Sequence, residues 1–158
     1  MTTKTTFFVK HFEIDSMKIV YHVYYPRWFE AGRTDYLKKS GISNSHINHQ
    51  GFYLPLSEIQ CRFKSPAKFG DEIAVTTSIS YMSCVKIKFE YKVINIKNGQ
   101  LIAVGYSVHA WTDNNISPIN IEKTAPDLFL TLKAFSEKPS SLDDIESVAS
   151  HGSLAKMS

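Results

Sequence analysis

One stretch of the chain combines an acidic residue, an apolar turn and the start of a helix, and it runs from Glu13 to Pro26. This order places the carboxylate of Asp15 beside backbone N–H groups that the first turn of a helix leaves unpaired. Such N–H groups bind a carbonyl oxygen as it becomes negative, and a carboxylate beside them acts as a base or a nucleophile. The stretch therefore predicts a minimal acyl-transfer site, although an aspartate before a helix is more often a cap or a loop residue.

Other catalytic motifs are missing from the sequence. It contains no Gly-x-Ser-x-Gly elbow, no phosphate loop, no dinucleotide-binding glycine fingerprint and no Cys-x-x-Cys pair. His46 and His49 have a spacing that would clamp a metal if the segment were helical, but no third ligand of suitable spacing is near. We interpret the polar stretch 43–50 as a solvated loop, and we expect neither a metal nor a cofactor.

A long apolar helix is predicted directly after the candidate site. Pro26 suits its first turn and Gly41 suits its end. The residues between them recur at helical spacing on a wide apolar face, which carries Tyr25, Trp28, Phe29, Gly32 and Tyr36. The glycine at its centre would let another backbone approach closely. Glu30 and Arg33 are expected to pair and so to stabilise the helix rather than to contact a substrate.

Three long strands follow, because apolar residues alternate with polar ones over 72–81, 85–93 and 102–110. A two-residue connection joins the first two strands, and Asn98-Gly99 between the last two predicts a type I′ turn. Together the strands predict an antiparallel meander. The apolar face of the third strand consists of Ile102, Val104, Tyr106, Val108 and Ala110.

Two earlier strands are expected over 6–12 and 52–64, and the second slips phase between Leu56 and Ile59, which indicates a β-bulge. The apolar helix must be covered, and the sheet is its available partner. A short helix over 126–135 closes the domain. The sequence therefore predicts an α+β fold, in which an antiparallel five-stranded sheet is wrapped around one long central helix.

Length and composition agree with one domain, residues 1–135, followed by a polar tail, residues 136–158, that is a frayed helix or disordered. The chain has 158 residues, of which 13% are aromatic, and this favours strands and a large apolar interior. The net charge of +3 divides into +5 for the domain and −2 for the tail. Without a long basic run, this charge predicts no nucleic-acid partner.

The cysteine count and the hydropathy indicate a compartment. Cys61 and Cys84 are too few for a disulfide framework, and we interpret them as buried thiols in a reducing compartment. The first ten residues hold no apolar core of signal-peptide length, and no 18 apolar residues run together. We therefore expect a soluble cytoplasmic protein with no membrane span.

The residues around the candidate carboxylate resemble a known family. The pattern Asp15-x6-His22-x2-Tyr25-x2-Trp28-Phe29-Glu30-x2-Arg33 is similar to the signature of hotdog-fold acyl-CoA thioesterases of the 4-hydroxybenzoyl-CoA thioesterase-like family. Segments 65–71 and 89–91 resemble the strand-joining turn and the central strand of the same family. The resemblance covers roughly residues 6–135 and implies the hotdog fold, which agrees with the architecture predicted above.

The resemblance assigns roles to two residues. In that family the aspartate of the motif is the catalytic carboxylate, which maps onto Asp15. The backbone N–H that polarises the thioester carbonyl maps onto His22. The His22 side chain either orients Asp15 or contacts the thioester, or the backbone alone functions. We further expect Tyr21 and Tyr24 to line the acyl pocket.

Two departures from the family pattern concern charge. Many relatives have a glycine three residues after the catalytic aspartate, where this chain has Lys18. Because a lysine prefers ordinary φ, we expect a re-shaped loop, in which Lys18 either faces solvent or favours an anionic acyl group or a CoA phosphate. Some relatives hold CoA phosphates with basic residues at a hairpin that here reads Met82-Ser83-Cys84. The remaining candidates for those phosphates are Lys86, Lys88, Lys64 and Lys68.

The resemblance implies an acyl-CoA thioesterase, which hydrolyses a thioester to a free carboxylic acid and CoA. One alternative is an acyl-ACP thioesterase within a biosynthetic pathway, where the basic domain contacts an acidic acyl carrier protein. Another is a non-catalytic acyl-CoA-binding hotdog protein. Members of this family assemble with their sheets edge to edge, so we expect a homodimer or a homotetramer.

Overall fold

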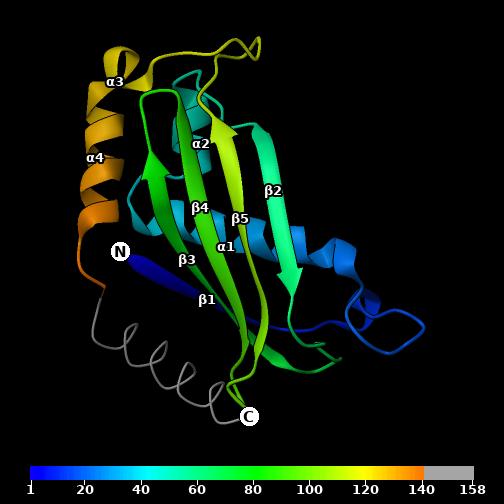
Figure 1. Ribbon diagram of the computed structural model, residues 1–158. Helices are drawn as coiled ribbons and strands as arrows, with labels where there is room; N and C mark the ends of the chain where they lie inside the picture. The colour runs from blue at the N-terminus through cyan, green and yellow to red at the C-terminus, as the bar shows by residue number, and fades with distance from the viewer. Residues whose placement is uncertain (141–158) are drawn as a thin grey trace.

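The computed structural model describes residues 1–140, in which five antiparallel strands form one sheet (Figure 1). The strands lie in the order β1-β3-β4-β5-β2. Their bounds are Thr2–Phe8 (β1), Leu56–Phe63 (β2), Glu72–Met82 (β3), Lys86–Asn95 (β4) and Leu101–Ala110 (β5). The meander of β3, β4 and β5 is confirmed. The bulge predicted in β2 is confirmed by a register shift between Leu56 and Glu58.

Helix α1, Tyr25–Lys39, crosses one face of this sheet, as the sequence predicts (Figure 1). Its aromatic stripe is buried, and the ring of Phe29 stacks on that of Tyr91 in β4 with centroids 4.4 Å apart. The close approach predicted at Gly32 is confirmed, because a Cβ there would lie 2.5 Å from Thr77 Oγ1 in β3. The sheet wrapped around one helix is the hotdog arrangement, and the predicted α+β fold is confirmed.

Strand β5 turns a different face to the helix than its apolar pattern suggests. Gly105 lies opposite Tyr91, and a Cβ at Gly105 would lie 2.7 Å from the Phe29 ring. The face that carries Gly105 is therefore the one toward α1, and its side chains are mostly small or polar because the helix lies so close. The apolar residues of the predicted face alternate with it and point outward, away from the helix: Val104, Tyr106 and Val108.

The first strand lies earlier than the predicted span 6–12, because residues His11–Glu13 form a 3-10 turn instead. Both carboxylate oxygens of Glu13 hold this turn in place. One accepts from the N–H of Lys10 at 2.8 Å and the other from the indole N–H of Trp28 at 2.9 Å. A buried carboxylate with two charge-assisted hydrogen bonds prevents the segment from continuing as a strand.

The connection between β4 and β5 is longer than a type I′ turn. Gly99 has a φ of 70°, but Asn98 does not share the positive φ that such a turn requires, so that prediction is wrong. The side chain of Asn95 accounts for the difference, because its oxygen accepts the N–H of Lys97 at 3.0 Å and so begins the turn earlier.

The segment 43–50 is helical rather than the predicted loop. Helix α2 spans Asn44–His49, and the Ser43 hydroxyl caps it by accepting the N–H of His46 at 3.2 Å. The side chains of His46 and His49 are both exposed.

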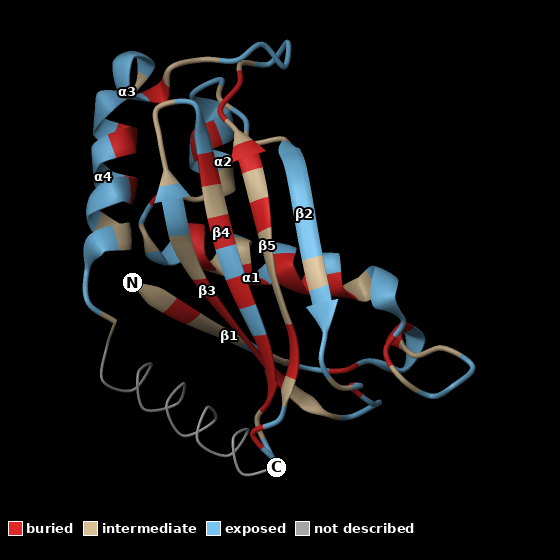
Figure 2. Cartoon of the chain, in the orientation of Figure 1, coloured by how far each residue is buried: buried red, intermediate tan, exposed pale blue. Residues whose placement is uncertain are grey.

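The predicted closing helix is confirmed as α4, Pro126–Glu137, which follows the short helix α3, Ile121–Thr124. Figure 2 shows that α4 buries one side and exposes the other. Most of the predicted tail, residues 141–158, lies outside the described residues. Cys61 and Cys84 are free and half-buried rather than buried, and burial raises the pKa of the Cys61 thiol to about 11.

Candidate active site

Asp15 lies in the turn of a short hairpin between β1 and α1. The Ile14–Val20 bridge and a hydrogen bond from the Asp15 N–H to the Ile19 oxygen (2.8 Å) join its two arms. Carboxylate oxygen Oδ1 accepts the N–H of Met17 at 2.7 Å, the usual role of an aspartate at the first position of a turn. Oxygen Oδ2 accepts no hydrogen bond from residues 1–140. The half-buried carboxylate therefore stabilises its own turn and still has an oxygen available for chemistry.

Lys18 adopts the backbone conformation that a glycine usually supplies at this place. Its φ is 64°, and its N–H donates to the backbone carbonyl oxygen of Asp15 at 3.0 Å. Residues 16–18 thus form a three-residue hairpin loop that ends in a left-handed residue. The prediction of a re-shaped loop is therefore wrong. The pairing of the two arms imposes the turn, and Lys18 adopts the positive φ that the turn requires. The Lys18 side chain is exposed.

We expect Lys18→Gly to be at least as stable as the native chain. Glycine removes about 1–2 kcal/mol of left-handed strain, and the greater freedom of its unfolded chain offsets about 0.4–1 kcal/mol of that gain. Lys18→Val combines a positive φ with a β-branched side chain and should lose at least about 1 kcal/mol. Urea unfolding of the three proteins measures the order. Equal stability of the valine and glycine variants would contradict the left-handed conformation at this position.

The backbone N–H of His22 lies at the start of a helical segment. A 3-10 turn, His22–Tyr24, leads directly into α1, and the Tyr21 side chain before it makes no capping hydrogen bond. The N–H of Tyr21 donates to the backbone carbonyl oxygen of Glu13 at 2.8 Å, whereas the N–H of His22 donates to no acceptor among residues 1–140. The hairpin thus carries a carboxylate at its turn and an unpaired donor at its base, a combination suited to stabilising an oxyanion.

Glu13 is the residue of this site that the sequence analysis did not identify. Its side chain is 7% exposed, and it ties the hairpin to α1 through the Trp28 indole while its backbone oxygen holds Tyr21. A single acidic residue between Phe12 and Ile14 was the available signal, because a carboxylate in an apolar run is buried only when it is hydrogen-bonded. Among residues 1–140, Glu13 makes no hydrogen bond to the Asp15 side chain or to the His22 N–H. It positions both through its bonds to Trp28 and Tyr21.

The predicted aromatic side chains surround the base of the hairpin. The rings of Tyr21 and His22 meet edge to face at 4.6 Å, and within the described residues no hydrogen bond joins the His22 ring to Asp15. Tyr24 is half-buried against Phe12, with ring centroids 6.1 Å apart. Large apolar side chains near them remain exposed, namely Phe12, Met17, Val23, Phe63 and Phe69. This rim could accommodate an apolar acyl group.

The structure does not bring Lys86 to Asp15. Lys86 begins β4 and pairs with Ala110 at the end of β5, near the top of the sheet in Figure 1. The Asp15 hairpin instead pairs with the segment after β2, where Ile19 bridges to Lys68. A strand of ten residues is about 30 Å long, so Lys86 is too distant to contact the same group in one chain. Lys18 lies in the same loop as Asp15, and Lys68 lies on the segment that pairs with this hairpin.

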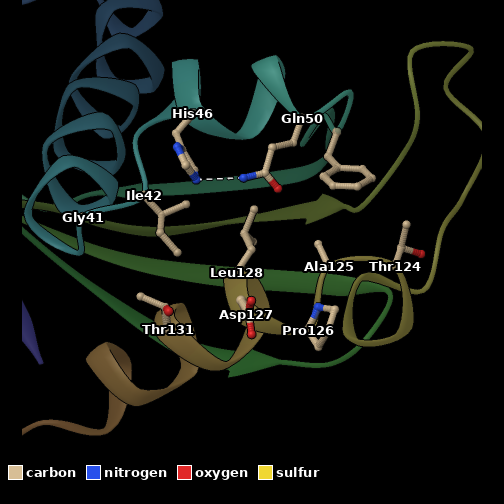
Figure 3. Close-up of a pocket in the computed structure, with 11 residues that line it drawn as sticks. Gly41, Ile42, His46, Gln50, Thr124, Ala125, Pro126, Asp127, Leu128 and Thr131 are labelled. Carbon is tan, nitrogen blue, oxygen red and sulfur yellow. Dashed lines mark hydrogen bonds between the residues drawn. The ribbon is translucent and has the colours of Figure 1, made fainter.

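A separate cavity of about 670 Å³ lies between α2 and the α3–α4 segment (Figure 3). His46 and Gln50 form one wall, with their side-chain nitrogens 2.8 Å apart, and Asp127 and Leu128 belong to the opposite one. None of the predicted site residues lines it. Within residues 1–140, no cluster of three metal-ligating side chains exists. None of the helices in that range combines the length and apolar character needed to cross a membrane.

Comparisons with known proteins find thioesterases among the relatives of this chain. A family model described as the thioesterase-like superfamily matches residues 9–144. YneP of Bacillus subtilis (strain 168), a candidate acyl-CoA thioesterase, is 32% identical over 120 residues, covering 75% of this chain and 86% of that protein. The chloroplastic acyl-acyl carrier protein thioesterase ATL3 of Arabidopsis thaliana is 27% identical over 122 residues, which are 77% of this chain. The match spans 64% of the length of that plant protein.

A solved structure shows the same fold. The DHNA-CoA thioesterase from Staphylococcus aureus has a TM-score of 0.79 at 22% identity, covering 96% of this chain and 95% of that one. At this identity the likeness supports the arrangement of sheet and helix alone.

Proposed function

The chain belongs to the thioesterase-like superfamily, and from that premise we propose that it hydrolyses an acyl thioester at the Asp15 hairpin. The observation that carries the proposal is that one short hairpin and its base hold the Asp15 carboxylate and the His22 N–H. Within residues 1–140, Oδ2 of that carboxylate and this N–H make no hydrogen bond. The first group supplies a base or nucleophile and the second stabilises an oxyanion. Purified protein mixed with acyl-CoAs of several chain lengths and with aromatic acyl-CoAs should release free thiol.

The proposed reaction consumes one water molecule. The thioester carbonyl oxygen accepts the His22 N–H, which stabilises the charge that develops when the carbon is attacked. As a base, Asp15 removes a proton from water, the water oxygen bonds to the carbonyl carbon, and the C–S bond breaks. The departing sulfur then takes the proton from the Asp15 carboxyl group and leaves as the thiol. As a nucleophile, the Asp15 carboxylate bonds to the carbonyl carbon, and the C–S bond breaks to give an acyl anhydride and a thiolate that takes a proton from solvent. Water then hydrolyses the anhydride to the free acid and restores the Asp15 carboxylate. Both routes give a free acid and a thiol, and Tyr21 and Tyr24 would contact the acyl group.

We infer that CoA is the principal carrier and that Lys18 and Lys68 attract its phosphates, since both lie on the segments beside Asp15. Raising salt from about 20 to 200 mM should then lower kcat/KM for acyl-CoA severalfold, and it should not affect an acyl-pantetheine, which has no phosphates. Lys68→Met should flatten this salt dependence, while Lys123→Met, on α3 at the opposite end of the sheet, should keep it. If the protein instead hydrolyses an acyl-ACP much faster than the acyl-CoA at equal concentration, the carrier is acyl carrier protein, the one in the name of the plant relative.

The sheet edge supports a proposal about assembly. Strand β2 lies at the end of the sheet and is exposed along most of its length (Figure 2). Its helix-facing side chain Phe63 is 55% exposed. An exposed apolar edge strand is a template for pairing with another chain, so we propose a homodimer joined at β2 or a homotetramer of such dimers. We also propose that the protein acts in the cytoplasm.

A further inference from the structure

A second cavity, of about 400 Å³, lies between α1, the segment before β2 and the loop after β5. Arg33 forms part of its wall, together with the side-chain amides of Asn44 and Asn48. Arg33 follows His22 by 11 positions on one helical segment, so at a rise of 1.5 Å per residue it lies about 16 Å further along. The cavity is therefore separate from the Asp15 hairpin, and its volume is within the range of small-molecule sites.

The charge of Arg33 has no carboxylate partner within residues 1–140. The predicted pairing with Glu30 is wrong, because the ion pair found in this part of the chain joins Lys39 to Asp35. Arg33 instead donates from Nη1 to the Tyr91 hydroxyl at 3.3 Å. Asp113 also lines the cavity, but its Oδ1 accepts two N–H groups of its own loop at 2.8 and 3.0 Å.

A buried chain of hydrogen bonds holds Arg33 in this position. Tyr91 and Ser107 are 2.6 Å apart, Ser107 lies 2.9 Å from Nε2 of His109, and Nδ1 of His109 lies 3.0 Å from the Leu54 oxygen. Burial, and then the charge of Arg33, lower the pKa of His109 to about 4, so the ring is neutral at pH 7. A neutral ring that donates at Nδ1 accepts at Nε2.

The donor and the acceptor of each hydrogen bond in this series follow from that tautomer. Ser107 donates to His109, and Tyr91 donates to Ser107, which leaves the Tyr91 oxygen to accept from Arg33. A guanidinium has five N–H donors, and the hydrogen bond to Tyr91 occupies one of them. The remaining donors are available to the cavity, where no described side chain pairs with them.

We propose that this cavity binds a small organic anion, a carboxylate or a phosphate, through Arg33, with Asn44 and Asn48 supplying further donors. A half-buried guanidinium that forms no ion pair within residues 1–140 is unfavourable, and its planar fork matches both anions with two parallel hydrogen bonds. Within one chain the cavity and the Asp15 hairpin lie at different places along α1, and binding of an anion at Arg33 can be measured without thioester turnover. Both kinds of anion are nevertheless present in a thioesterase, as the acid product and as the phosphates of CoA.

Calorimetric titration of the full chain with inorganic phosphate, CoA and octanoate tests the proposal and separates the two sources. At least one probe should bind, and Arg33→Gln should weaken that binding about ten- to a hundredfold. Lys39→Gln, which removes a cation from the same helix outside the cavity, should bind as the native chain does. Asn48→Leu should weaken the same probe if Arg33→Gln fails to fold.

Two results would overturn the proposal. One is equal affinity of the native protein, Arg33→Gln and Asn48→Leu for every probe that binds. The other is no binding of any probe to the native protein; if Arg33→Gln then also changes the oligomeric mass, a carboxylate of a second copy occupies the cavity instead.

Discussion

Replacing Asp15 by asparagine is expected to lower kcat for thioester hydrolysis by about 10²- to 10⁴-fold while the fold is retained. The substitution separates two roles of this side chain. Its Oδ1 accepts the N–H of Met17, and an asparagine oxygen accepts the same bond, so the hairpin turn should persist. Asparagine cannot take a proton from water or form an anhydride, so the chemical step should fail. A loss in kcat with little change in KM is the signature of an interaction made in the transition state.

Asp71→Asn is the matched control for this experiment. Asp71 caps a neighbouring turn through its Oδ2, which accepts the N–H of Lys68 at 2.9 Å, so it shares the structural role of Asp15 without the proposed chemical one. Both variants should unfold within a few degrees of the native protein, and Asp71→Asn should keep its kcat. Equal losses of activity in the two variants would assign Asp15 to the turn rather than to catalysis.

The free energy of unfolding is expected to fall by about 3 kcal/mol between pH 7 and pH 4 through His109. Burial lowers the pKa of this ring to about 4 in the folded chain, whereas an unfolded histidine has a pKa of about 6.5. Between these values the unfolded chain binds the extra proton and the folded chain does not. The contribution of His109 is therefore fully present above pH 6.5 and is lost as the pH falls toward 4.

His109→Gln tests this expectation, because glutamine hydrogen-bonds without titrating in this range. The variant should be less stable at pH 7, since it disturbs the bonds to Ser107 and Leu54, but its stability should change less with pH. His46→Gln removes an exposed histidine and should keep the native slope. Denaturant unfolding at several pH values measures all three proteins. A native slope in His109→Gln would show that other groups cause the acid sensitivity.

Periodic features of this fold were predictable from the sequence. The aromatic stripe of α1 and the alternation of β3 and β4 follow from spacing alone, because the buried faces of helices and strands repeat at fixed intervals. In β5 the alternation identified an apolar face but did not show which face contacts the helix. Its face toward α1 is defined by the contact of Gly105 with Phe29, and that contact depends on how closely two distant segments pack.

The groups that complete the sites were predicted only in part. The motif around Asp15 and His22 was visible because its members are close in the chain. Glu13 was not identified, since its role depends on a hydrogen bond to Trp28 fifteen residues later. Arg33 was expected to pair with Glu30 nearby, but its partner is Tyr91, which is 58 positions away. The left-handed φ of Lys18 was likewise hidden, because lysine disfavours it and the hairpin pairing imposes it.

The measurement that tests the central claim most directly compares thioester binding with thiol release in the native protein and Asp15→Asn. Equilibrium binding and single-turnover release would be followed with the same acyl-CoA. We expect the native protein to bind the thioester and release free CoA, and Asp15→Asn to bind it with similar affinity and release almost none. Tight binding by the native protein without any release would contradict hydrolysis at the Asp15 hairpin and identify a non-catalytic acyl-CoA-binding protein.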